Sequence, residues 1–172
     1  MADRPVETAS PACSMHEAGD AYMGYATAQE LGAFLNELLE AERAGTGVAL
    51  RSAEGAAGTP FVGLLHDIHM DEARWCAMLL RQLKALGVPA STKVGAFEEK
   101  CLAIGPLPER LAFLNRGQGW VVKKLREMLP RVRDDGLHRD LTAMLDSHVA
   151  NIERANQAQK AGGEGNAGSP HR

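Results

Sequence analysis

The chain has 172 residues, of which 45% are hydrophobic and 24% are charged, and its formal net charge at pH 7 is −3. This balance is typical of one globular domain, and the even mixture of acidic and basic residues gives no basic surface for a nucleic-acid partner. No apolar run is long enough to cross a bilayer and the segment MADRPVETASPACSMHE lacks the apolar centre of a signal peptide, so we expect a cytoplasmic protein without a membrane partner.

The first segment predicts an irregular arm. Residues 1–26 are rich in Pro, Ala, Ser and Gly and show no apolar periodicity. Within the arm, CSMHE brings Cys13 close to Met15 and His16, a set of soft ligands that suits copper or a redox-sensing thiol. Three such residues on an irregular segment also arise from ordinary composition. The chain's three cysteines are widely spaced, which indicates neither a disulfide framework nor a zinc knuckle and fits a reducing compartment.

The next two segments have helical periodicity. The first helix is expected over residues 28–50, because Thr27 and Glu30 have the spacing of a capping box. The second is expected to start with Thr59 as its cap and to end at Gly87, the residue type that most often follows a helix. The short link between the two segments predicts an antiparallel hairpin.

The second half of the chain predicts another hairpin. A third helix is expected over residues 108–129, where Pro130 stops it, and a fourth follows the RVRDDG turn and ends near Gln159. The link over residues 88–107 is long enough to travel the length of a bundle, and its AFEEKCLAI segment predicts a short helix. No segment alternates like a strand, so we expect an all-α fold of two antiparallel hairpins joined by a long crossover.

These segments divide the chain into three parts. Residues 1–26 form the arm, and residues 27–159 form the predicted four-helix bundle. Residues 160–172, KAGGEGNAGSPHR, contain almost no large apolar side chain and predict a disordered tail.

Each predicted helix carries one polar residue at the centre of its apolar stripe. At about 100° per residue, every stripe is otherwise aliphatic or aromatic near its middle. The four polar residues are Glu42, Glu72, Gln118 and His148. An unpaired ionised carboxylate in such a core is very unfavourable, so each group needs a partner, a metal ion or a changed protonation state. We therefore expect the four side chains to meet one another.

The segment HDIHMDEARWCAML contains several possible metal ligands, but the helical period places few of them on the buried face. His66 and Asp71 fall outside the apolar stripe, His69 lies at its margin, and Glu72 lies at its centre. Two glycines in NRGQGW, within the third helix, indicate a close approach of another element or space beside Gln118.

The segments LLEAERAG and DEARWCAMLL resemble a hairpin of the ferritin-like superfamily, whose four helices and long crossover hold two metal ions. Together with CSMHEAGDAYMGY and LAFLNRGQGWVVKKLREMLPRVRDD, they resemble more narrowly a bacterial ferritin-like domain family of unassigned function. The resemblance extends from Ser10 to about Asn156. It implies a ferritin-like four-helix bundle and does not specify a reaction.

The superfamily pattern supplies Glu from the first and third helices and Glu-x-x-His from the second and fourth. Three residues match the pattern: Glu42, Glu72 and His148. Three depart from it: Trp75 in place of the first His, Gln118 in place of a Glu, and Leu145 in place of the last Glu. Two carboxylates do not offset the charge of two iron ions. The resemblance therefore implies one Fe, Mn or Zn ion at most, held by the three matching residues and the Gln118 amide, with His69 as a weaker further ligand.

Other interpretations remain open at this stage. The four central residues also suit a hydrogen-bonded polar cluster without any metal, in a non-catalytic helical binding or assembly module. Such a module is expected to form a homodimer through an exposed face of the bundle. A thiol redox sensor that uses Cys13 is a third class. The sequence alone does not decide whether the protein is an enzyme.

Overall fold

The computed structural model describes residue 19 and residues 22–165, with side chains up to residue 161. Within these residues the chain is helical and contains no strand, so the predicted all-α fold is confirmed. The long helices are α2 (Ala28–Glu54), α3 (Val62–Ala85), α5 (Leu107–Met128) and α6 (Asp135–Gly165). The predicted short helix is α4 (Phe97–Leu102), and a 3-10 turn, η2 (Leu129–Arg131), follows α5. Cys13, Met15 and His16 lie outside the described residues.

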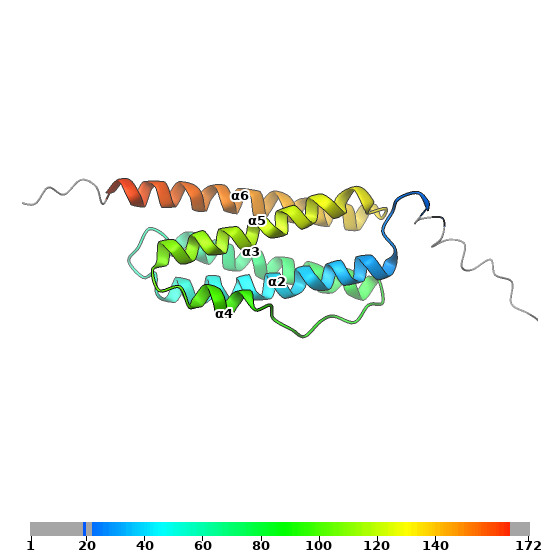
Figure 1. The fold of residues 1–172 in the computed structure, drawn as a ribbon, viewed down its shortest axis with the longest axis horizontal. Helices are drawn as coiled ribbons and strands as arrows, with labels where there is room; N and C mark the ends of the chain where they lie inside the picture. The colour runs from blue at the N-terminus through cyan, green and yellow to red at the C-terminus, as the bar shows by residue number, and fades with distance from the viewer. Residues whose placement is uncertain (1–18, 20–21, 166–172) are drawn as a thin grey trace, which may run out of the picture.

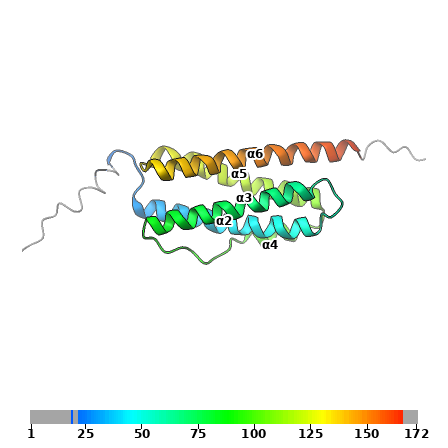
Figure 2. The same cartoon turned by 180° about the vertical axis from the view of Figure 1, so that it is seen from behind.

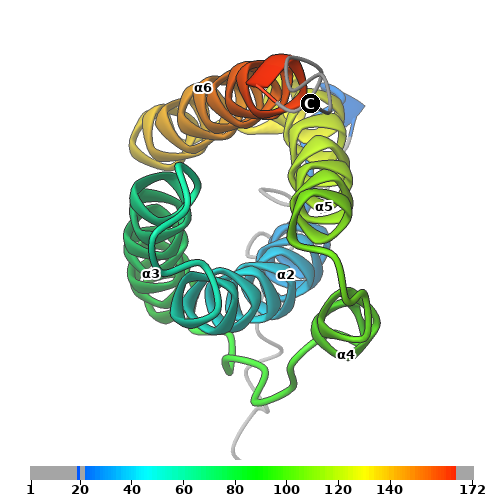
Figure 3. The ribbon, with the colours of Figure 1, turned by 90° about the vertical axis from the view of Figure 1, so that its left-hand side faces the viewer.

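The long helices form two hairpins that lie against each other. In Figures 1 and 2, α2 lies beside α3 and α5 lies beside α6, and the partners in each hairpin run in opposite directions. Seen from the end in Figure 3, these four helices surround a common centre, while α4 lies outside the ring against α2 and α5. None of the described helices is apolar over a length that could span a membrane.

The helix ends agree with the sequence in part. The capping box before α2 is confirmed, because the Glu30 amide donates to Thr27 Oγ1 (3.2 Å) and the Thr27 amide donates to Glu30 Oε2 (2.8 Å). The sequence predicted Thr59 as the cap of α3, and this prediction is wrong. The Thr59 hydroxyl donates to the Ala56 carbonyl (2.7 Å) within the turn, and Phe61 occupies the cap position without a side-chain hydrogen bond.

Two helices are longer than the sequence predicted. The first helix, α2, continues to Glu54, and α6 continues to Gly165, through residues 160–165 of the predicted tail. The small residues that suggested a helix end weaken a helix by only about 1 kcal/mol per glycine, and this is not enough to end an established helix.

The core consists of two apolar clusters with a polar layer between them. The first cluster includes Leu35, Leu38, Leu79, Leu83, Val121, Leu125, Leu141 and Met144. The second includes Val48, Ala49, Leu65, Ile68, Leu111, Leu114 and Ala155. On every long helix, one cluster precedes the central polar residue and the other follows it. The polar residues therefore lie at one level, about midway along the bundle.

The crossover from α3 to α5 is held against α2 by polar contacts. Asn36 Nδ2 donates to the Pro89 carbonyl (3.0 Å), and Asn36 Oδ1 accepts from the Ser91 amide (2.6 Å). Arg43 donates to the Ser91 carbonyl. Side chains of α2 thus form hydrogen bonds with backbone N–H and C=O groups of this irregular segment. These bonds hold the crossover, and with it α4, beside the middle of the bundle.

Candidate functional site

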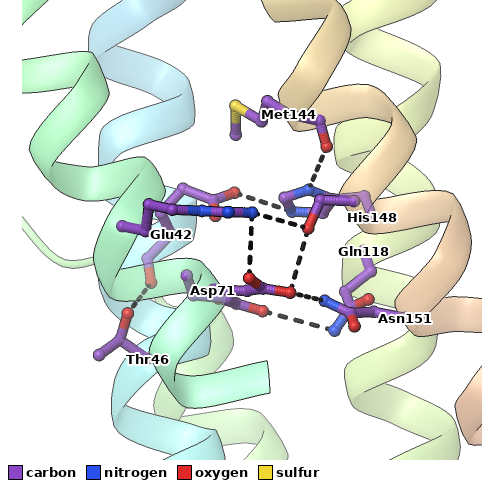
Figure 4. A network of polar contacts seen from close by, with 10 residues as sticks. Glu42, Thr46, Asp71, Gln118, Met144, His148 and Asn151 are labelled. Carbon is purple, nitrogen blue, oxygen red and sulfur yellow. Dashed lines mark hydrogen bonds and ion pairs between the residues drawn. The ribbon is translucent and has the colours of Figure 1, made fainter. Parts of the chain in front are cut away.

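The four polar residues at the stripe centres are all buried at the middle of the bundle. Glu42 on α2, Glu72 on α3, Gln118 on α5 and His148 on α6 are each at most 3% exposed. Their predicted burial is therefore confirmed, and the structure brings them together as a polar layer, of which Figure 4 labels Glu42, Gln118 and His148. The name polar layer is kept below for these four residues.

Two direct contacts join the polar layer. His148 Nε2 lies 3.2 Å from Glu42 Oε1, and both side chains are almost fully buried. The other ring nitrogen, Nδ1, donates to the Met144 carbonyl (2.9 Å), because a carbonyl oxygen can only accept. Gln118 Nε2 donates to Glu72 Oε1 over 3.5 Å, a long hydrogen bond. The layer thus consists of a carboxylate–imidazole pair and a carboxyl–amide pair.

The electrostatics of the layer favour protons on two of its groups. Burial raises the pKa of Glu72 well above its usual range, and the nearby Glu42 carboxylate and Asp71 raise it further. Burial alone would lower the pKa of His148, but the charge and hydrogen bond of Glu42 raise it above its usual value. Without another cation, these shifts favour a neutral Glu72 and a charged His148 that forms an ion pair with Glu42, at pH values below the raised pKa of each group.

These protons predict how stability depends on pH. In the folded state, the pKa values of Glu72 and His148 lie above their ordinary values of 4.5 and 6.5. The folded chain therefore binds these two protons more tightly than the unfolded chain does. A rise in pH through these values therefore favours the unfolded chain. We expect the free energy of unfolding of EDTA-treated protein, measured by urea denaturation, to fall between about pH 5 and about pH 8.

The Glu72→Gln variant is the control for this pH dependence. Its neutral amide replaces a carboxyl group that the fold keeps protonated, so it should lose stability less steeply as the pH rises. Glu30 does not contribute in this range, since the hydrogen bond from Arg131 lowers its pKa to about 2. Equal slopes for the wild type and the variant would show that Glu72 is already ionised.

The polar layer also contains oxygen atoms without a donor. Among the described residues, Glu42 Oε2 and Gln118 Oε1 are buried and accept no hydrogen bond. Buried acceptors are normally paired, because losing water without a replacement costs about 1–3 kcal/mol per group. Both atoms are acceptors only, so what they lack is a cation or a hydrogen-bond donor.

A cavity of about 460 Å³ connects the polar layer with the surface. All four residues of the layer line it, and the exposed side chains of Glu37 and Trp120 line it as well. Between these ends the wall is formed by α2, α5 and residues 95–97, where the crossover enters α4. A small molecule in this cavity would reach Glu42, Glu72 and His148 from outside.

Comparison with known proteins places this architecture in a family. Residues 29–158 match the model of a family described as "Domain of unknown function (DUF6306)". The chain belongs to the DUF6306 family. The matched region contains α3, α4 and α5 completely and nearly all of α2, so every residue of the polar layer is inside it. No curated protein and no solved structure matches the chain.

Two glycines of the DUF6306 domain make room for the site. A Cβ atom on Gly45 would lie 1.7 Å from Glu72 Oε2, so the carboxyl group occupies the space that any side chain on α2 would need. A Cβ atom on Gly117 would lie 2.6 Å from Phe97 Cζ, which allows α4 to approach α5. The expectation that the NRGQGW glycines permit close approach beside Gln118 is confirmed for Gly117, whereas Gly119 faces open space.

A second polar network next to the layer was missed by the sequence analysis. Asp71 accepts hydrogen bonds from Ser147 Oγ (3.1 Å) and Asn151 Nδ2 (3.0 Å) and pairs with Arg74 (3.0 Å) (Figure 4). Asp71 lies outside the apolar stripe of α3, as expected, but its carboxylate contacts two side chains of α6. Asn151 is buried. Its position one turn after His148 on the same helix face could have indicated this burial from the sequence.

The remaining residues named from the sequence do not join the polar layer. His69 is half-buried, its Nδ1 lies 3.2 Å from the Thr46 carbonyl, and it is not among the residues that line the cavity. Trp75 is buried and Leu145 is half-buried, and both pack in the first apolar cluster. His66 is exposed, as expected. Trp75 and Leu145 are therefore part of the apolar packing next to the polar layer.

The polar layer offers possible ligands for a metal ion but no ready-made metal-binding group. Within the described part of the DUF6306 domain, no three His, Cys, Asp or Glu side chains already form a metal-binding group. Glu42 and His148 bond to each other, so an ion would have to separate them slightly. The unpaired Glu42 Oε2 and Gln118 Oε1 are oxygen ligands of the type that hard and borderline divalent ions accept. By ligand type, two carboxyl groups, one imidazole and one amide oxygen suit one divalent ion and are too few for two.

Proposed function

We propose that this DUF6306 domain is a ferritin-like four-helix bundle that binds one divalent ion of Fe, Mn or Zn in its polar layer. The observation that carries the proposal is the convergence of Glu42, Glu72 and His148 at the inner end of an open cavity, where acceptor oxygens lack a partner. A divalent ion would satisfy these oxygens and neutralise two buried carboxylates together.

The side chains of the layer would share the ion in distinct roles. Glu42 and Glu72 would provide the negative charge, and the Gln118 amide oxygen would provide a neutral ligand. His148 is oriented for binding through Nε2, since Nδ1–H donates to the Met144 carbonyl as in many metal-binding histidines. A bound ion would supply Lewis acidity to a molecule in the cavity.

Metal content can test the proposal directly. Protein without a histidine tag, produced with iron, manganese and zinc supplements, should contain a near-stoichiometric amount of one metal by elemental analysis. The Glu72→Gln and His148→Ala variants should lose it, because each removes an anionic or imidazole ligand. The Asp71→Asn variant is the matched control, since Asp71 lies next to the layer without lining the cavity. A wild-type protein free of all three metals would refute the proposal.

One observation favours a second candidate function. The Glu42–His148 pair is already formed without an ion, which suits a polar cluster that fixes the register of the helices. The domain would then be a non-catalytic binding or assembly module, and the homodimer expected from the sequence remains a prediction. The redox-sensor alternative depends on Cys13, which lies outside the described residues and stays a prediction. Cys76 and Cys101 do not suit such a role, because burial raises the pKa of each thiol to about 11.

A further inference from the structure

The cavity beside the polar layer is much larger than a metal ion requires. Its volume of about 460 Å³ lies in the range of about 300–1,000 Å³ that is typical of pockets for small organic ligands. The cavity therefore has room for a molecule with a carbon skeleton, whether or not a metal is bound.

The walls of the cavity are mainly apolar and are held in place. Ala41, Leu114 and Val121 line the cavity from α2 and α5, and Phe97 lines it from α4. Phe97 stacks on the Phe113 ring, with 5.0 Å between ring centroids. An aliphatic or aromatic body is the part of a ligand that such walls would contact favourably.

The inner end of the cavity offers two acceptor oxygens that have no partner. Both ring nitrogens of His148 are engaged, with Glu42 and with the Met144 carbonyl, and Gln118 Nε2 donates to Glu72. The unpaired atoms are Glu42 Oε2 and Gln118 Oε1. A carboxylate or phosphate at this place would lie against the Glu42 carboxylate, and two like charges close together are unfavourable in a buried site. An ammonium group carries three donors and a positive charge, and it matches these acceptors.

The charge along the cavity also favours a cation. Its lining contains the carboxylates of Glu37, Glu40 and Glu42, against the cations Arg116 and His148. Arg116 lies over the Phe113 ring, 4.9 Å from its centroid. Acidic lining in a cleft raises the local concentration of cations and repels anions.

We propose that the cavity binds a primary organic amine, with its carbon body between Ala41, Leu114 and Phe97 and its ammonium group at Glu42 Oε2 and Gln118 Oε1. This inference does not rest on the metal proposal. Because an ammonium group and a metal ion would use the same oxygen atoms, the two ligands should compete.

Calorimetric titration of EDTA-treated protein with three six-carbon probes tests the inference. Hexylamine should bind at one site, at least about tenfold more tightly than 1-hexanol, which is the factor that one charge-assisted hydrogen bond provides. Hexanoate should not bind measurably. No binding of hexylamine, or equal binding of hexylamine and hexanol, would overturn the inference.

Two variants locate the bound amine. Ala41→Leu narrows the cavity without changing the polar layer, and Gln118→Met removes one acceptor while keeping the length of the side chain. Each should weaken hexylamine binding at least about tenfold while the helical circular dichroism signal is retained. Binding that both folded variants leave unchanged would place the amine elsewhere and refute the site.

The same protein samples separate this inference from the proposed function. If both are right, saturating the site with zinc should abolish hexylamine binding to the wild type. If only the metal proposal fails, hexylamine binds and none of the three metals does. If only the amine inference fails, metal binds and hexylamine does not.

Discussion

The His148→Leu variant is expected to be less stable than the wild type by about 3–5 kcal/mol, the usual cost of removing one partner from a buried ion pair. His148 Nε2 lies 3.2 Å from Glu42 Oε1, and the Glu42 side chain is only 1% exposed. Without the imidazole, the buried carboxylate would lose the cation that pairs with it. Urea denaturation followed by circular dichroism measures the change in the free energy of unfolding.

A double variant distinguishes the loss of the pair from a simple packing defect. Glu42→Met combined with His148→Leu removes both charged groups, and apolar replacement of a whole buried pair is often close to neutral. The double variant should therefore recover most of the stability that His148→Leu loses. Additive losses would show instead that the pair is not coupled.

An exposed pair in the same bundle provides the control. Arg81 and Asp140 join α3 and α6 across 3.1 Å, and their side chains are 64% and 33% exposed. The Arg81→Ala variant should lose at most about 1 kcal/mol, because solvent screens such pairs. A similar loss for Arg81→Ala and His148→Leu would mean that burial does not set the strength of the Glu42–His148 pair.

The helical period predicted the centre of the site well. Glu42, Glu72, Gln118 and His148 each interrupt an aliphatic stripe, and a residue at the middle of a stripe is buried wherever its helix packs. The direction of each stripe depends on one helix alone, so this part of the structure is encoded locally. The polar layer could therefore be predicted before any contact between helices was known.

Features that depend on two elements were not predictable in this way. Asp71 lies at the side of the α3 stripe, and only the position of Ser147 and Asn151 on α6 gives it buried partners. The cavity depends on where the crossover places Phe97 against α5, and irregular backbone has no period that reveals its path. The identity of any ligand depends on which hydrogen-bond donors and acceptors have no partner in the folded protein. The sequence does not reveal these unpaired atoms, because they are known only once the helices are packed.

The Gly45→Ala variant is expected to lose about 1–3 kcal/mol of stability, the typical effect of overpacking a core, although alanine is the better helix former by up to about 1 kcal/mol. The added Cβ atom would lie 1.7 Å from Glu72 Oε2, so the carboxyl group must leave its place. The same variant should lose bound metal and weaken hexylamine binding. Urea denaturation, elemental analysis and calorimetry measure the three effects.

Two companion variants separate the clash with Glu72 from the effect of alanine on the helix. Gly119→Ala adds the same methyl group within α5, where nothing lies within 4 Å of the new atom, and it should be as stable as the wild type or more stable. Gly45→Ala combined with Glu72→Ala removes the displaced carboxyl group, so most of the lost stability should return while metal binding stays absent. If Gly45→Ala instead matches Gly119→Ala in stability and keeps its ligands, Glu72 can turn aside freely, and the packing of its carboxyl group against α2 does not hold the site in place.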